Sequence, residues 1–162
     1  GYVADSAITV QVGEVSEEIA HLLRVTEESL YAGIDKMRVG NTVGDVGAAV
    51  QEFVEKRGLE VTREYTGHGV GRTMHEGPQL PNYGTAGRGL KLLAGMTIAL
   101  EPMVLIGTPH TQVLADQWTV ISRNHKPTAH FEHTVAITEA GPRILTLLAD
   151  GRSPGRIQPA AV

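Results

Sequence analysis

The sequence predicts an α+β fold in which helices cover one face of a largely antiparallel sheet. Apolar residues recur at helical spacing only within residues 16–58, and the remainder consists of short β-rich runs separated by Gly, Pro and Asn. Helices segregated from strands in this way are typical of α+β domains, whereas regular alternation would favour a parallel βαβ sheet, which is the weaker interpretation. The length of 162 residues suits a single domain.

The first predicted element is a strand over residues 3–12, because polarity alternates along it until Gly13. One side carries Ser6, Ile8, Val10 and Val12, and the other carries Asp5, Ala7, Thr9 and Gln11.

Two amphipathic helices are predicted next. Ser16 provides an N-cap for the first, whose apolar periodicity continues to Gly40. Thr42 and Asp45 form a similar cap for the second, which is expected to end at Gly58.

The second half is predicted to be mostly strand and loop. Its β-rich runs are residues 61–66, 96–106, 118–122, 129–138 and 143–148. We therefore expect one domain over residues 1–148, followed by a flexible tail over residues 149–162, which is rich in Pro, Gly and Ala.

Composition narrows the function classes. A formal net charge of −4 gives no indication of a nucleic-acid partner. The absence of cysteine excludes disulfides, thiolate metal ligands and cysteine nucleophiles, so any metal must bind oxygen and nitrogen atoms. No apolar run approaches the roughly 18 residues that span a bilayer, and no secretory signal pattern is present, so the sequence predicts a cytoplasmic protein without membrane contact.

Glu101 interrupts the apolar run 96–106 immediately before Pro102, and it is predicted to be buried or nearly so. A buried carboxylate costs several kcal/mol unless a cation faces it, so its partner is either Arg or Lys, or a metal ion. This strand viewed alone leaves both interpretations open.

Glu132 presents the same problem in the run 129–138. Alternation places it on the face of His130, Thr134 and Ala136, opposite Phe131, His133, Val135 and Ile137. We expect His133 to be a hydrogen-bonded core residue outside the site. For His130, a place near the site and exposure to solvent both stay open.

His68 lies between Gly67 and Gly69 at the end of a predicted strand, and His75 follows in the same segment. The two glycines are expected to allow a tight turn and close approach of ligands to His68. A dinucleotide-binding turn is excluded because no amphipathic helix follows, and a zincin helix is excluded because His75 has no second histidine four residues on.

Asp5, His68, Glu101 and Glu132 together offer oxygen and nitrogen donors from four predicted strands or strand ends. Carboxylate-rich sets with one imidazole suit Mn²⁺, Fe²⁺, Co²⁺ or Zn²⁺. The sequence therefore predicts a hydrolytic metal centre.

Four ordered motifs strongly resemble the type I methionine aminopeptidases, metallopeptidases of the pita-bread fold. They are residues 67–72 (Gly-His-Gly-Val-Gly-Arg) with His75-Glu76, residues 95–103 (Gly-Met-Thr-Ile-Ala-Leu-Glu-Pro-Met), residues 116–120 (Asp-Gln-Trp-Thr-Val) and residues 130–134 (His-Phe-Glu-His-Thr). The resemblance extends from Gly1 to about Leu148, and it implies a pita-bread fold with a curved, largely antiparallel sheet.

This resemblance implies a set of metal ligands. Asp5 and Glu132 would bridge two divalent ions, and His68 and Glu101 would complete the first ion's protein ligands. Glu101 would also take a proton from the attacking water.

The resemblance also implies substrate contacts. His75 would hydrogen-bond the substrate at the scissile amide, and Met74 and Trp118 would form walls of the methionine pocket. The implied substrates are peptides and nascent proteins that begin with Met.

The family's other aspartate ligand lies upstream of the position matched by Asp5. The sequence is therefore expected to correspond to the larger C-terminal part of such an enzyme, with a weakened second metal site, weak activity and a possible need for a complementing N-terminal fragment. Two alternatives stay open: a catalytically inactive pita-bread module that binds peptides or proteins, and a proline-type aminopeptidase or prolidase.

Overall fold

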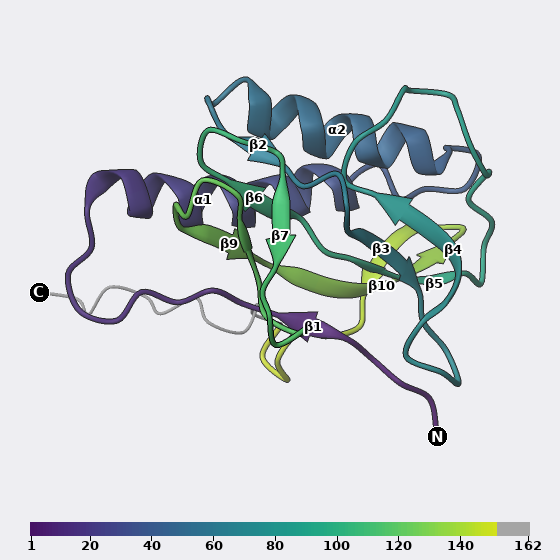
Figure 1. The fold of residues 1–162 in the computed structure, drawn as a ribbon. Helices are drawn as coiled ribbons and strands as arrows, with labels where there is room; N and C mark the ends of the chain where they lie inside the picture. Colours follow the sequence, from purple (N-terminus) through teal and green to yellow (C-terminus); the bar gives the residue numbers. More distant parts are fainter. Residues whose placement is uncertain (152–162) are drawn as a thin grey trace, which may run out of the picture.

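The structure is a computed structural model that describes residues 1–151. It confirms the predicted α+β class: α1 (Glu17–Ile34) and α2 (Val43–Glu55) lie side by side over the strands, and the N-terminal segment with β1 (Ser6–Ala7) runs along the other side (Figure 1). The predicted tail, residues 149–162, lies for the most part outside the described residues. Neither helix within the described part is long and apolar enough to cross a membrane.

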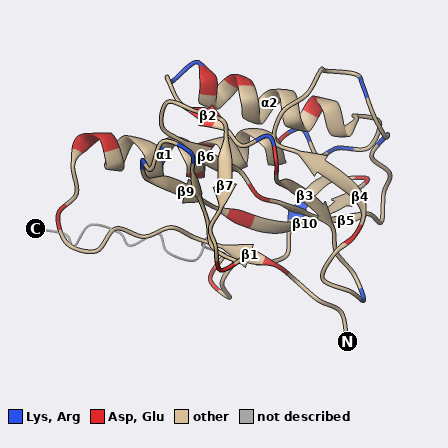
Figure 2. Ribbon diagram, in the orientation of Figure 1, with Lys and Arg blue, Asp and Glu red and all other residues tan. Residues whose placement is uncertain are grey.

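Both helices begin at their predicted caps. The Ser16 side chain accepts from the backbone N–H of Ile19, and Thr42 with Asp45 forms a reciprocal capping box. Figure 2 shows acidic residues in the first turn of each helix, where they complement the helix dipole. The first helix ends at Ile34 rather than near Gly40, because the fully buried Met37 lies in the following turn and extends the apolar pattern beyond the helix.

A six-stranded antiparallel sheet forms the centre of the molecule. Its order is β1-β10-β5-β3-β4, with β11 also paired to β10. The strands are β3 (Thr66–Gly69), β4 (Glu76–Pro81), β5 (Thr97–Leu100), β10 (Glu132–Thr138) and β11 (Gly141–Ile144).

Two smaller antiparallel sheets complete the described part. One has the order β2-β6-β9, from β2 (Glu60–Val61), β6 (Met103–Leu105) and β9 (Thr128–His130), and the other pairs β7 (Thr111–Val113) with β8 (Val120–Ser122).

Two predicted strands are each divided where they pass from the three-stranded sheet to the six-stranded sheet. The run 96–106 breaks at Glu101 and Pro102 into β5 and β6, and the run 129–138 breaks at Phe131 into β9 and β10. Proline has no N–H for a ladder, and the Phe131 N–H donates to the Pro102 carbonyl at 3.3 Å, so the two breaks lie together. Glu101 and Glu132 are therefore both placed at this crossing point.

Three further expectations about strands were wrong. Within the predicted strand 3–12 only Ser6 and Ala7 pair with β10, although residues 3–10 keep the alternating exposure of a strand. β4 was not among the predicted β-rich runs, yet it is the last strand in the sheet order, where its residues Pro78 and Pro81 can be accommodated. β7 was not predicted because its three residues are too few for a period.

The core lies between the helices and the sheet. Its fully buried apolar side chains include Leu22, Val25, Leu30, Val46, Val50, Ile98, Leu100, Val104, Val135 and Ile137. Burial of one such side chain contributes about 1.5–3 kcal/mol. The helices thereby fix one face of the sheet, and the candidate site lies towards the side where β1 runs.

Candidate metal centre

Four adjacent strands of the central sheet each bring one predicted ligand to the same place. Asp5 immediately precedes β1, Glu132 opens β10, Glu101 immediately follows β5, and His68 lies in β3 opposite Ala99. Figure 2 shows acidic residues just before β1 and at the start of β10. The sequence alone could not supply this strand order, β1-β10-β5-β3.

The donor atoms are spaced as ligands of one ion would be. His68 Nε2 lies 3.4 Å from Glu101 Oε1 and 3.9 Å from Asp5 Oδ2. Asp5, His68 and Glu132 also offer ligand atoms that all lie within 4.8 Å of one another. Metal–ligand bonds of ~2.1 Å at a tetrahedral angle separate two ligand atoms by about 3.4 Å, whereas N–H···O hydrogen bonds cluster near 2.9 Å.

Glu132 is the most deeply buried of the carboxylates, with 4% of the residue exposed. Its Oε1 atom is buried without a hydrogen-bond partner. Burial, together with the nearby negative charges of Glu101 and Asp5, raises the pKa of Glu132 to about 8. Without a cation, this carboxyl group therefore holds a proton at neutral pH.

The residues present fit a divalent cation. Glu101 forms no ion pair with Arg or Lys among residues 1–151, and its charged-group contacts there are the imidazoles of His68 and His130. Of the two partners left open for Glu101, Arg or Lys on one hand and a metal ion on the other, the structure therefore favours the metal ion. The orphaned Glu132 Oε1 and the all-oxygen-and-nitrogen donor set support the same conclusion.

His68 is oriented by its own strand. Its Nδ1 donates to the carbonyl oxygen of Gly69 at 3.0 Å, which fixes the tautomer and leaves the Nε2 lone pair directed at the carboxylates. The flanking glycines serve close strand packing and not the tight turn expected: a Cβ at Gly67 would collide with the Ala99 carbonyl, and one at Gly69 with the Gly77 carbonyl.

Two threonines that the sequence analysis did not single out attach the N-terminal segment to β9 and β10. The Thr134 hydroxyl accepts from Asp5 N at 2.8 Å and donates to Asp5 O at 2.7 Å. Thr9 makes the equivalent pair of bonds to the backbone of His130, at 2.9 and 2.7 Å. Asp5 and Glu132 are held in register by these side chains, since β1 itself contributes only two paired residues.

A buried asparagine fixes the backbone at Glu101. Asn82, which is fully buried, donates from Nδ2 to the Glu101 carbonyl at 2.9 Å. This bond satisfies the backbone exactly where the strand breaks before Pro102. An isolated Asn after a proline-containing strand gave no signal in the sequence.

His75 lies beside the cluster on the loop between β3 and β4. Its ring centroid is 4.3 Å from that of His68, with the planes tilted by 55°. The neighbouring Glu76 carboxylate accepts from the N–H groups of Arg72 and Thr73 and from the Thr73 hydroxyl, and these bonds lower the pKa of Glu76. The loop is thereby shaped so that an exposed imidazole stands next to the carboxylates.

The other two histidines of this region have different surroundings. His133 is buried, with Nδ1 2.8 Å from the Thr146 hydroxyl and burial lowering its pKa, as expected of a core residue. His130 is neither simply exposed nor remote: 37% of its side chain is exposed, but Nε2 is buried and lies 3.5 Å from Glu101 Oε2.

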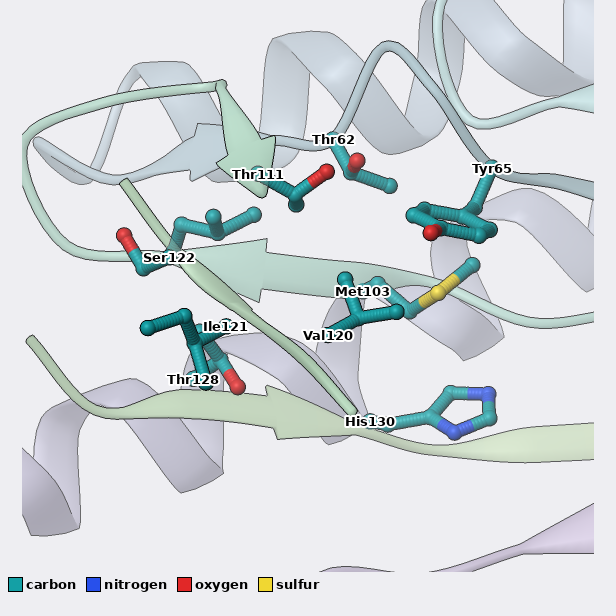
Figure 3. A pocket seen from close by; sticks show the side chains of 10 residues that line it. Thr62, Tyr65, Met103, Thr111, Val120, Ile121, Ser122, Thr128 and His130 are labelled. Atoms are coloured by element: carbon teal, nitrogen blue, oxygen red, sulfur yellow. The ribbon is translucent and has the colours of Figure 1, made fainter. Parts of the chain in front are cut away.

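A largely apolar pocket of about 250 Å³ adjoins the cluster. His130 lies at one end of it, beside Met103 and Tyr65 (Figure 3). Met74 and Trp118, which were expected to form walls of the methionine pocket, are not among the residues that line this cavity. Met74 and Trp118 are exposed, Trp118 to 86%, so neither side chain is enclosed in a pocket among the described residues.

Comparison with known proteins identifies relatives over most of the chain. Residues 1–139 match the profile described as Metallopeptidase family M24. The methionine aminopeptidase of Clostridium acetobutylicum is 48% identical over 147 residues, which cover 91% of this chain and 59% of that protein. Methionine aminopeptidase 1 of Bacillus subtilis is 49% identical over 146 residues, covering 90% and 59% respectively. The chain thus spans about three-fifths of the length of these relatives.

Solved structures agree with these matches. A methionine aminopeptidase from Thermotoga maritima superposes with a TM-score of 0.88 at 48% identity, covering 90% of this chain and 58% of that one. Prolidase from Pyrococcus furiosus superposes with a TM-score of 0.71 at 24% identity, covering 91% and 38%, which shows a shared fold alone. These likenesses confirm the predicted pita-bread fold.

Proposed function

The chain belongs to metallopeptidase family M24, and we propose on that premise that it carries most of the site of an aminopeptidase that removes N-terminal methionine from peptides and nascent proteins. The observation that carries this proposal is the convergence of Asp5, His68, Glu101 and Glu132 from four adjacent strands, with His75 beside them. The relatives near 48% identity are named methionine aminopeptidases, which favours this substrate over the proline-type alternative.

Asp5, His68, Glu101 and Glu132 would hold divalent metal ions, with Co²⁺, Mn²⁺, Fe²⁺ and Zn²⁺ as candidates. When bound, such an ion supplies a water of low pKa that can attack an amide carbonyl at neutral pH. Glu132 must give up its proton for this site to load, because its pKa is about 8 in the absence of a cation.

Glu101 is the proposed proton acceptor for the attacking water. One of its oxygens faces His68 and the other faces His130, and within residues 1–151 no Arg or Lys pairs with the carboxylate. His75 is the proposed donor to the substrate carbonyl, where negative charge develops in the transition state.

Substrate side chains have two places to bind. The exposed Met74 and Trp118 are proposed to contact the methionine side chain, although they need a further surface opposite them to form a closed pocket. The apolar pocket that His130 shares with the cluster offers room for a second substrate residue.

The chain spans about 59% of its relatives' length, so its activity alone is proposed to be weak. A complementing polypeptide, matching the part of a relative that precedes the aligned region, is proposed to raise the rate. We propose a cytoplasmic location, because nascent proteins are the proposed substrates.

The test is release of free methionine from a Met-Ala-Ser peptide by metal-free chain, by chain with added Co²⁺ or Mn²⁺, and by chain with metal and the complementing polypeptide. We expect release only with metal and a higher rate with the complement. Glu101→Gln should remove the activity, and His110→Ala, at an exposed histidine that pairs with Glu64 and is not a member of the ligand set, should not.

Three results would contradict the proposal. Release without metal would exclude metal-dependent hydrolysis, and preferential cleavage of Xaa-Pro or Pro-initiated peptides would support a proline-type enzyme. Peptide binding without hydrolysis under every condition would indicate an inactive binding module.

A further inference from the structure

The outer edge of the central sheet is a feature that the proposed activity does not use. β1 stands first in the strand order, so one of its two sides is unpaired within residues 1–151. Figure 1 shows the N-terminal segment on this outer side, beside the segment that follows β11. Thr134 joins the two segments, because its hydroxyl bonds the backbone of Asp5 and its N–H donates to the Thr146 hydroxyl.

Exposed apolar side chains lie along this edge. Among residues 1–151, fifteen large apolar side chains are exposed, and six of them belong to residues 8–12 and 145–148. These six are Ile8, Val10, Val12, Leu145, Leu147 and Leu148. Single apolar side chains scattered over a surface are ordinary, whereas a group of this kind indicates an interaction site.

The backbone of the N-terminal segment offers open hydrogen-bonding groups at the same edge. Asp5 turns its N–H and C=O towards the Thr134 hydroxyl on β10. Along an extended segment, successive residues direct these groups to opposite sides, so those of Ser6, Ile8 and Val10 face away from β10. The alternating exposure of the side chains shows that the segment is extended as far as Val10. A further strand can therefore pair with it.

This edge lacks the features that keep strand edges of different molecules apart. Residues 6–12 include no charged residue and no proline. The opposite end of the sheet differs, because β4 contains Pro78, Pro81 and the exposed Glu76. Charges and prolines protect an edge strand, and an exposed apolar edge without them is prone to pair with another chain. Pairing is therefore expected through the β1 edge and not through β4.

We propose that the β1 edge is an interface with a second copy of this chain, in which residues 6–12 of the two copies pair as antiparallel strands about a two-fold axis. The outward groups of Ile8 in one copy then bond those of Val10 in the other, and Thr9 lies on the axis.

Such an interface suits the chemistry of the segment. The Ile8 and Val10 side chains of both copies form one apolar cluster, and no like charges within residues 6–12 oppose the pairing. Because the same edge is used by both copies and β4 offers no further pairing, assembly stops at a dimer. The interface is independent of the proposed function, since none of residues 6–12 belongs to the metal-ligand set.

The first test is the mass in solution, measured by sedimentation equilibrium in the presence of a chelator over a wide range of chain concentrations. We expect the mass to rise from that of one chain to that of two. Ile8→Lys and Val10→Lys each bring two like charges into the apolar cluster, and each should weaken dimerisation by more than about tenfold.

Val113→Lys is the matched control and should dimerise like the unmodified chain. Val113 is exposed to 51%, against 50% for Val10, but it lies in β7. Because Ile8, Val10 and Val113 are all exposed, the three substitutions leave the core intact, and far-ultraviolet circular dichroism checks the fold of each variant.

The second test determines the register of the pairing. The chain has no cysteine, so Ile8→Cys and Val10→Cys each introduce a single thiol. Directly paired residues have Cα atoms about 5.5 Å apart, within reach of a disulfide, whereas the two copies of Ile8 would be offset along the strands and separated by more than about 7 Å. Oxidation with diamide should therefore cross-link a mixture of the two variants, and neither variant alone.

A chain that stays monomeric at every concentration would overturn the inference. So would Lys variants that impair only binding of the complementing polypeptide, since that polypeptide would then be the occupant of the edge. Dimers weakened equally by Val113→Lys, or cross-linked by either Cys variant alone, would overturn the proposed pairing. The proposed function is tested separately by metal-dependent methionine release and stands or falls without these results.

Discussion

The protonation of Glu132 should make the metal-free chain less stable as pH rises. Its pKa is raised from 4.5 to about 8 in the folded chain, so between these values the folded state binds one proton more than the unfolded state. The free energy of unfolding then falls by about 1.4 kcal/mol per pH unit in this range. The stabilisation that comes from the protonated carboxyl group is complete below pH 4.5 and is lost as pH rises through about 8.

The perturbation is Glu132→Gln, which keeps the shape of the side chain and removes its titration. Urea unfolding in the presence of a chelator at pH 5.5, 6.5 and 7.5 gives the free energies of both proteins. Between pH 5.5 and 7.5 the free energy of unfolding of the unmodified chain should fall by up to roughly 3 kcal/mol relative to that of Glu132→Gln. With a dependence of unfolding free energy on urea of about 2 kcal/mol per molar, the unfolding midpoint of the unmodified chain should fall by up to about 1.5 M relative to the variant.

Saturating Mn²⁺ should reverse the comparison, because the ion takes the place of the proton and stabilises only the chain that has the carboxylate. Parallel pH dependences of the two metal-free proteins would refute the reasoning, since they would show that Glu132 titrates alike in the folded and unfolded states.

Three further predictions concern the surroundings of the cluster. Thr134→Val should weaken Mn²⁺ binding by about 10–100-fold in calorimetry because Asp5 loses both of its hydroxyl bonds, and Thr134→Ser should restore it. His75→Ala should slow methionine release by the complemented enzyme by about 10²–10³-fold while Mn²⁺ affinity stays nearly unchanged, and loss of metal would contradict its placement on the substrate. Gly69→Ala should lower the free energy of unfolding by about 1–3 kcal/mol in urea titrations, because its Cβ would meet the Gly77 carbonyl; an unchanged midpoint would contradict the close packing of β3 on β4.

The sequence predicted those features whose interacting groups lie close together along the chain. The caps at Ser16 and Thr42 lie within a few residues of the groups they bond, so both helix starts were predicted correctly. Glu101 and Glu132 stood out because a carboxylate in an apolar run needs a nearby cation, and both lie in the candidate site. The helix ends and the strand divisions were predicted less well, because Met37 is buried, and Phe131 partly buried, against the core although neither residue lies in a helix or strand.

The sequence by itself determined which side chains can take part in chemistry. They are carboxylates and imidazoles within strands, where burial costs free energy unless a cation or a hydrogen-bond partner is present. Only the tertiary structure decided which of them meet, because the order β1-β10-β5-β3 joins residues more than a hundred positions apart. It also decided the role of His130, which alternation alone could not separate from a solvent-facing residue, and of Thr134 and Asn82, whose partners are far away in the sequence. The physical reason is that hydrogen bonds and ligand distances act over a few ångströms in space, whatever the separation along the chain.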